Sequence, residues 1–197
     1  MKSKKTVLVL LLVFVLLMTG ATALYRKLGQ NIAVEQLATQ EPQQETVSET
    51  GSEETEPEEI KAPDFTVYDG EGKEVRLSEY MGKPVVLNFW ASWCGPCQME
   101  MPDFHEKYLA SGEEIQFLMV NMTDGMRETV ETASAFLAET GYTFPVLFDT
   151  KGEAAITYGV YSLPTTFFID AEGHPIARAT GAIDGETLQR GIDMITG

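Results

Sequence analysis

The chain has 197 residues, of which 30 are acidic and 14 are basic, and its formal net charge at pH 7 is −16. A protein this acidic is not expected to bind nucleic acid or to lie flat on anionic lipid. The only two histidines, His105 and His174, are far apart in the sequence. A structural zinc site takes about four cysteine or histidine ligands, so we expect no metal, and no other cofactor.

Residues 1–27 form either a membrane anchor or a secretory signal. Three lysines among the first five residues precede an apolar run at 7–18. As a helix, residues 6–25 would be roughly 30 Å long, just enough to cross a bilayer. Residues 21–23, Ala-Thr-Ala, are a possible cleavage site, and cleavage would give a secreted protein. The length of the span favours an uncleaved, single-pass anchor with the rest of the chain outside the cytoplasm.

Residues 28–62 have the composition of a disordered linker. They contain nine glutamates and one lysine, with almost no large apolar residue in their second half. Such a segment cannot bury enough apolar surface to offset its ordering entropy. Residues 63–197 are long enough for one domain with its own core, which we expect to be monomeric.

Strand-like and helix-like segments alternate along this domain. The predicted strands are residues 65–68, 74–77, 84–90, 115–121, 144–148, 165–169 and 175–180. The predicted helices are residues 97–109, 128–140, 153–158 and a last helix that Asp184 caps and that runs to about Ile195. This order predicts an α/β protein that begins with a β-hairpin and has a mixed sheet covered by helices on both faces.

The two cysteines lie in the sequence Trp93-Cys94-Gly95-Pro96-Cys97, directly after the third predicted strand. This position places Cys94 near a helix N-terminus, where unpaired N–H groups and the helix dipole favour a thiolate. A thiolate is the species that attacks a disulfide. Cys97, one turn further on, can close a small disulfide ring and release the first partner. The pair therefore predicts a thiol-disulfide oxidoreductase.

Other uses of a cysteine pair fit less well. A c-type haem site requires histidine after the second cysteine, where this chain has Gln98. A purely structural disulfide usually closes a longer loop than this one.

Residues 89–97, together with Pro102 and residues 163–166, resemble thioredoxin-fold proteins. Three features are similar to the membrane-anchored, extracytoplasmic TlpA/ResA-like disulfide reductases. These are the spacing Cys-x-x-Cys-x-x-Glu-x-Pro that ends at Pro102, the Asn-Phe-Trp strand at 88–90, and an inserted helix and strand at 128–148. The resemblance implies a thioredoxin-like fold and a redox-active disulfide without a cofactor.

The resemblance also implies roles for single residues. Cys94 would attack and Cys97 would resolve, while Gly95-Pro96 is similar to the pair in reducing thioredoxins and favours a reductant. Glu100 would be the acid or base for Cys97, because it lies on the same helix face three residues later. Asn88 stands where cytoplasmic thioredoxins have a titratable aspartate, so it cannot take this role. An apolar setting would raise the pKa of Glu100 to suit it.

Three further residues complete the predicted site. Trp93 either packs beside the cysteines or is an ordinary core aromatic. By the same resemblance, Pro164 is expected to be cis and to face the cysteines. The backbone of Leu163 could then pair with an extended client segment.

The expected partners are client proteins with disulfides and a membrane-embedded thiol donor of electrons. The resemblance suggests as clients apocytochrome c, a methionine sulfoxide reductase or mis-oxidised exported proteins. A peroxidase of the same fold would need threonine where Ala91 stands. A non-enzymatic module that binds haem or a client, and a disulfide oxidant, are the remaining alternatives.

Overall fold

The computed structural model describes residues 37–39 and 60–197. They form one eight-stranded sheet with the order β1-β8-β7-β4-β5-β6-β2-β3. The strands are β1 (Leu37–Thr39), β2 (Thr66–Tyr68), β3 (Glu74–Arg76), β4 (Val85–Trp90), β5 (Gln116–Asn121), β6 (Val146–Phe148), β7 (Thr165–Ile169) and β8 (Pro175–Thr180). The helices are the 3-10 helix η1 (Leu77–Tyr80), α2 (Gly95–Ser111), α3 (Val130–Thr140), α4 (Glu153–Thr157) and α5 (Gly185–Thr196).

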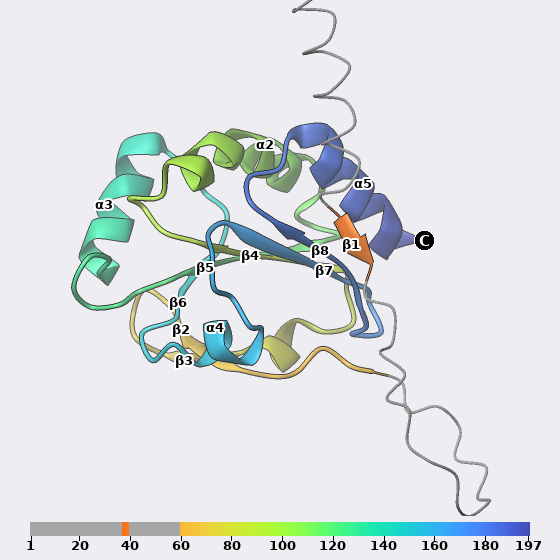
Figure 1. Ribbon diagram of the computed structural model, residues 1–197, viewed down its shortest axis with the longest axis horizontal. Coiled ribbons are helices and arrows are strands. Elements are labelled where there is room, and N and C mark those ends of the chain that lie inside the picture. Colours follow the sequence, from red (N-terminus) through yellow and green to blue (C-terminus); the bar gives the residue numbers. More distant parts are fainter. Residues whose placement is uncertain (1–36, 40–59) are drawn as a thin grey trace, which may run out of the picture. The chain divides into compact units, whose positions relative to one another are not determined.

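Strand β4 lies at the centre of the sheet and is buried along its whole length. It pairs with β5 in parallel and with β7 antiparallel. Its side chains alternate between two hydrophobic clusters, with Val86 and Trp90 in one and Leu87 and Phe89 in the other. Helices α2, α3 and α5 contribute to the first cluster and α4 to the second, and α2 and α4 lie on opposite faces of the sheet in Figure 1. The predicted mixed sheet with helices on both faces is confirmed.

Two helices begin at other residues than predicted. Helix α2 begins at Gly95 and not at Cys97, because Cys94 is its N-cap and accepts a hydrogen bond from the backbone N–H of Cys97. Helix α3 begins at Val130 after the N-cap Thr129, so Glu128, the first residue of the predicted helix, lies outside the observed one.

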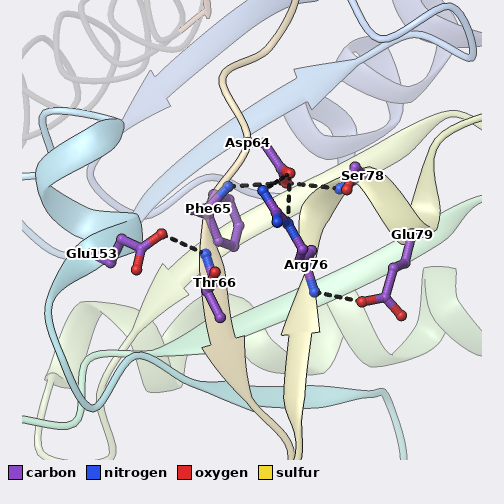
Figure 2. Close-up of polar contacts among 7 residues, drawn as sticks. All are labelled: Asp64, Phe65, Thr66, Arg76, Ser78, Glu79 and Glu153. Atoms are coloured by element: carbon purple, nitrogen blue, oxygen red, sulfur yellow. Dashed lines mark hydrogen bonds and ion pairs between the residues drawn. The ribbon is translucent and has the colours of Figure 1, made fainter.

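The predicted N-terminal hairpin is formed by β2 and β3, which pair antiparallel. Figure 2 shows how Asp64 holds its open end. One carboxylate oxygen, Oδ1, accepts hydrogen bonds from the backbone N–H groups of Phe65 and Ser78, both at 3.0 Å. The other, Oδ2, lies 2.8 Å from Nη2 of Arg76. At the start of β2, the backbone N–H of Thr66 donates a hydrogen bond to the side chain of Glu153 on α4.

A strand lies inside the segment 28–62, for which composition predicts a disordered linker. Leu37–Thr39 form β1, which pairs antiparallel with β8 in the register Leu37 to Ala179 and Thr39 to Ala177. At residue 62, the backbone N–H of Ala62 donates to the carbonyl of Gly173. The prediction is therefore wrong for these short stretches, where backbone pairing with β8 and the β7–β8 turn supplies order that composition does not reveal.

The predicted anchor or signal segment, residues 1–27, lies outside the described residues, as do residues 28–36 and 40–59 of the predicted linker. Among the residues that are described, none of the helices is both long and apolar enough to cross a membrane.

Candidate active site

The two cysteines lie where β4 meets α2, and they form a disulfide with their Cα atoms 5.2 Å apart. Both are buried, with exposed fractions of 4% for Cys94 and 0% for Cys97. Cys94, Gly95 and Pro96 nevertheless line a groove, and Cys97 is not among its lining residues. The Cys94 sulfur accepts a hydrogen bond from the backbone N–H of Cys97, 3.2 Å away. This N-cap position stabilises a thiolate at Cys94 in the reduced protein.

Glu100 is buried on α2, one helical turn after Cys97, with an exposed fraction of 2%. Its Oε1 accepts a hydrogen bond from Nδ2 of Asn88 at 2.8 Å, and its Oε2 accepts one from the backbone N–H of Ile183 at 3.0 Å. Burial raises the pKa of Glu100 to about 7, although both hydrogen bonds act to lower it. A carboxyl with this pKa exchanges protons near neutral pH, which is the property an acid or base for Cys97 requires.

The residues next to Glu100 in the sequence and in the fold differ in their exposure. Trp90 and Met101 are buried, as an apolar setting requires, but Met99 is 71% exposed. Asn88 donates a second hydrogen bond to Oγ1 of Thr166 at 2.9 Å. Its own Oδ1 is buried and has no hydrogen-bond partner among the described residues. Asn88 thus supports Glu100 as a donor and carries no proton exchange itself.

The predicted cis peptide bond joins Leu163 and Pro164 and is confirmed. It precedes β7, the antiparallel neighbour of β4, and so lies at the end of the sheet where the cysteines are. Leu163 lines the same groove as Cys94 and Pro96. The groove has a volume of about 410 Å³.

Trp93 is 41% exposed, so it is not a core aromatic. The guanidinium carbon of Arg127 lies 3.5 Å from the centroid of its indole ring. Both side chains line the groove, together with the 95% exposed Tyr161. Sequence reasoning missed Arg127 because nothing in the sequence signals a contact 34 residues away. Tyr161, an aromatic residue in a predicted loop just before Pro164, could have been found from its position.

Glu128 is a second residue that sequence reasoning missed. It is fully buried, and its carboxylate accepts hydrogen bonds from the backbone N–H and the hydroxyl of Ser92, at 2.8 and 2.7 Å. A third comes from Nδ2 of Asn121 at 2.7 Å. Glu128 therefore ties the turn just before Cys94 to the end of β5. The sequence offers no sign of this, because the residue resembles an exposed glutamate at a helix start.

No group of three or more His, Cys, Asp or Glu side chains within the described part of the chain could hold a metal ion.

The sequence of this chain is similar to those of known proteins. Residues 59–175 match the AhpC/TSA family. The thiol-disulfide oxidoreductase ResA of Geobacillus thermodenitrificans is 38% identical over 135 residues, which are 68% of this chain and 75% of that protein. ResA of Bacillus anthracis is 41% identical over 140 residues, or 69% of this chain and 77% of that one.

The fold also matches solved structures. A crystal structure from Chlorobium tepidum, assigned as the thiol:disulfide interchange protein DsbE, superimposes with a TM-score of 0.60 and 36% sequence identity. The match covers 70% of this chain and 96% of that one.

Proposed function

Because the chain belongs to the AhpC/TSA family and is a thiol-disulfide oxidoreductase of the ResA type, we propose that it reduces disulfides of client proteins outside the cytoplasm. The unequal placement of the two sulfurs carries this proposal. Cys94 lines the groove and Cys97 is completely buried behind it. Two-step thiol-disulfide exchange, in either direction, needs one sulfur that a client can reach and a second that only the first can reach.

The reaction then has two exchanges. The Cys94 thiolate attacks one sulfur of the client disulfide, which forms a mixed disulfide and releases the other client sulfur as a thiolate. Cys97, once deprotonated, attacks the Cys94 sulfur and displaces the second client thiolate. Two electrons pass to the client, whose two thiolates take up protons, and the protein keeps the Cys94–Cys97 disulfide.

Glu100 serves the second exchange. The buried Cys97 thiol must lose its proton to attack, and burial in apolar surroundings disfavours the thiolate. Glu100 is buried on the same helix one turn away, and its pKa of about 7 lets it take this proton at neutral pH. We assign it as the proton acceptor for Cys97 during resolution and as the donor during the reverse step.

Several sequence features support a reductant with a membrane tether. Gly95-Pro96 is similar to the pair of reducing thioredoxins, and residues 1–27 have the composition of a single-pass anchor or an export signal. An anchored domain would draw electrons from a thiol donor embedded in the same membrane. Apocytochrome c, awaiting haem attachment, is one client that this placement would suit, and an exported repair enzyme is another.

The redox potential of the Cys94–Cys97 pair tests the direction of transfer. Equilibration of the purified protein with dithiothreitol or glutathione buffers should give about −250 mV or lower. A value near −120 mV would make it an oxidant and overturn the proposal. Trapping mixed disulfides on a Cys97→Ala variant in the exporting cell would identify the clients, because this variant cannot resolve them.

A further inference from the structure

The groove beside Cys94 contains one cation, Arg127, among its lining residues. Its guanidinium group stacks on Trp93 with 3.5 Å between the guanidinium carbon and the ring centroid. No salt bridge to Arg127 is formed within residues 60–197. Stacking occupies a face of the guanidinium plane and leaves the N–H groups at its edge available for a carboxylate.

The loop that carries Arg127 is held in place from two sides. Oδ1 of Asp124 accepts hydrogen bonds from the backbone N–H groups of Met126, Arg127 and Glu128, at 2.8, 2.7 and 2.9 Å. The buried Glu128 then binds Ser92, the residue before Trp93. Two contacts therefore join this loop to the turn before Cys94. Glu128 bonds to Ser92 in the interior, and Arg127 stacks on Trp93 at the surface. The cation is positioned before any client arrives, which reduces the entropy lost on binding.

We propose that Arg127 on Trp93 is a binding subsite for an acidic side chain of the client, located within a few residues of the cysteine that Cys94 attacks. The inference rests on the proposed function, since the client must lie in the groove for the subsite to act. The exposed ring of Tyr161 and the side chain of Leu163 supply apolar surface on the same groove. The substrate class is thus an extended segment with an acidic and an apolar residue flanking its cysteine.

The net charge of the domain makes this proposal easy to distinguish from general electrostatics. Residues 63–197 contain 8 basic and 21 acidic side chains, a net charge of −13. The overall field of such a domain slows the approach of an acidic client and favours a neutral or basic one. A preference for acidic clients is therefore the opposite of what the net charge predicts, and it requires a local cation.

The test uses the reduced full chain and disulfide peptides with amidated C-termini. Each peptide has Glu at one of three positions on either side of the reactive cysteine, and each is matched with the corresponding Gln peptide. For at least one position, we expect kcat/KM for the Glu peptide to exceed that for the Gln peptide by about three- to tenfold. Arg127→Gln should abolish this ratio, and Arg127→Lys should retain part of it because the planar fork is lost. Lys73→Gln, on the exposed β2–β3 turn, is the control with the same change in net charge.

Each remaining outcome contradicts the proposal in a different way. Equal rates for all pairs would overturn the subsite and leave the proposed function standing. A Glu preference that survives Arg127→Gln would place the acid at another cation. If the amidated peptides show no preference but the same peptides made with a free C-terminal carboxylate react faster, the subsite belongs to chain ends and not to side chains. If the reduced protein reacts with none of the peptides, both the subsite and the proposed function fail.

Discussion

The side chain of Asn88 on β4 donates a hydrogen bond of 2.8 Å to the carboxyl of Glu100 on α2, and both residues are buried. Hydrogen bonds of this kind favour the ionised carboxylate, whereas burial favours the protonated acid. Burial is the larger effect here, and the pKa of Glu100 is raised from 4.5 to about 7. Asn88, which stands where cytoplasmic thioredoxins have a titratable aspartate, is thus a neutral hydrogen-bond donor in this protein. The titratable group is Glu100, on helix α2.

This raised pKa predicts how stability depends on pH. Between pH 4.5 and 7 the folded state keeps the Glu100 proton while the unfolded state loses it. Because the folded state then binds more protons, the free energy of unfolding should fall as the pH rises through this window, by about 3 kcal/mol in total. Urea unfolding of the oxidised protein at pH 4.5, 6 and 8 measures this loss.

Glu100→Gln should remove the Glu100 part of this dependence and leave a flatter profile. The substituted amide also meets the N–H groups of Asn88 and Ile183, so it adds a cost that does not vary with pH, and the slope is the informative quantity. Glu106→Gln, an exposed change on the same helix, should keep the wild-type slope. If Glu100→Gln kept it as well, the carboxyl would not be the titrating group.

The same substitution should separate the two exchange steps. Without a proton acceptor near Cys97, resolution of a mixed disulfide should slow by about 10²-fold or more, while attack by Cys94 should be much less affected. The pH dependence of resolution between about 5 and 8 should flatten. Single-turnover kinetics with a disulfide peptide report both steps. Resolution at the wild-type rate and with the wild-type pH profile would show that the Cys97 proton leaves through water.

Glu128 should control the geometry of the turn before Cys94. Glu128→Gln keeps one oxygen for the backbone N–H of Ser92 and Nδ2 of Asn121, but its amide nitrogen cannot accept from the Ser92 hydroxyl, and the negative charge that strengthens all three hydrogen bonds is lost. We expect a loss of about 1–3 kcal/mol in stability and a change in Trp93 fluorescence, because Trp93 directly follows Ser92. Glu131→Gln, on the exposed surface of α3, is the control. An unchanged stability and emission spectrum would show that the turn is held without Glu128.

Sequence reasoning succeeded where the signal is local. Three such signals each span only a few residues of sequence, and the structure has all three as expected. They are the apolar run at 85–90, the motif that contains Cys94 and Cys97, and the loop that ends at Pro164. Burial of Glu100 could be expected only through the resemblance, since helical spacing alone does not distinguish a buried glutamate from a solvated one.

The remaining contacts join segments that only the tertiary fold brings together. Oε2 of Glu100 meets the N–H of Ile183, 83 residues away, and Glu128 meets Ser92 across 36 residues. Strand β1 was missed for a related reason. Its three residues are ordered by backbone pairing with the edge of β8. The composition of residues 28–62 as a whole does not reveal a strand of only three residues.

Strand β1 has a measurable consequence. A chain that begins at Ala62 lacks β1 and exposes the edge of β8 at residues 177–179. Amide exchange in β8 should quicken relative to a chain that begins at Leu28, and Tm should fall by about 2–4 °C for each 1 kcal/mol that the pairing contributes. Ala38→Pro in the longer chain is the matched variant, because it disrupts the pairing without removing residues. Insulin reduction should be equal in all three, since the groove does not include β1. Identical exchange rates would contradict pairing of β1 in solution.

The last prediction concerns the two sulfurs. In the reduced protein, limiting iodoacetamide should label Cys94 well before Cys97. Cys94 lines the groove and its sulfur accepts the backbone N–H of Cys97, so it is reachable and its thiolate is favoured. Cys97 is fully buried, and alkylation there requires the fold to open. Peptide mapping after a short exposure at pH 7 should therefore find the label on Cys94. Labelling of both residues should become comparable only in denaturant, where the difference in access disappears. Preferential labelling of Cys97 in the folded protein would reverse the two roles, and the groove beside Trp93 would then not be the place where clients are attacked.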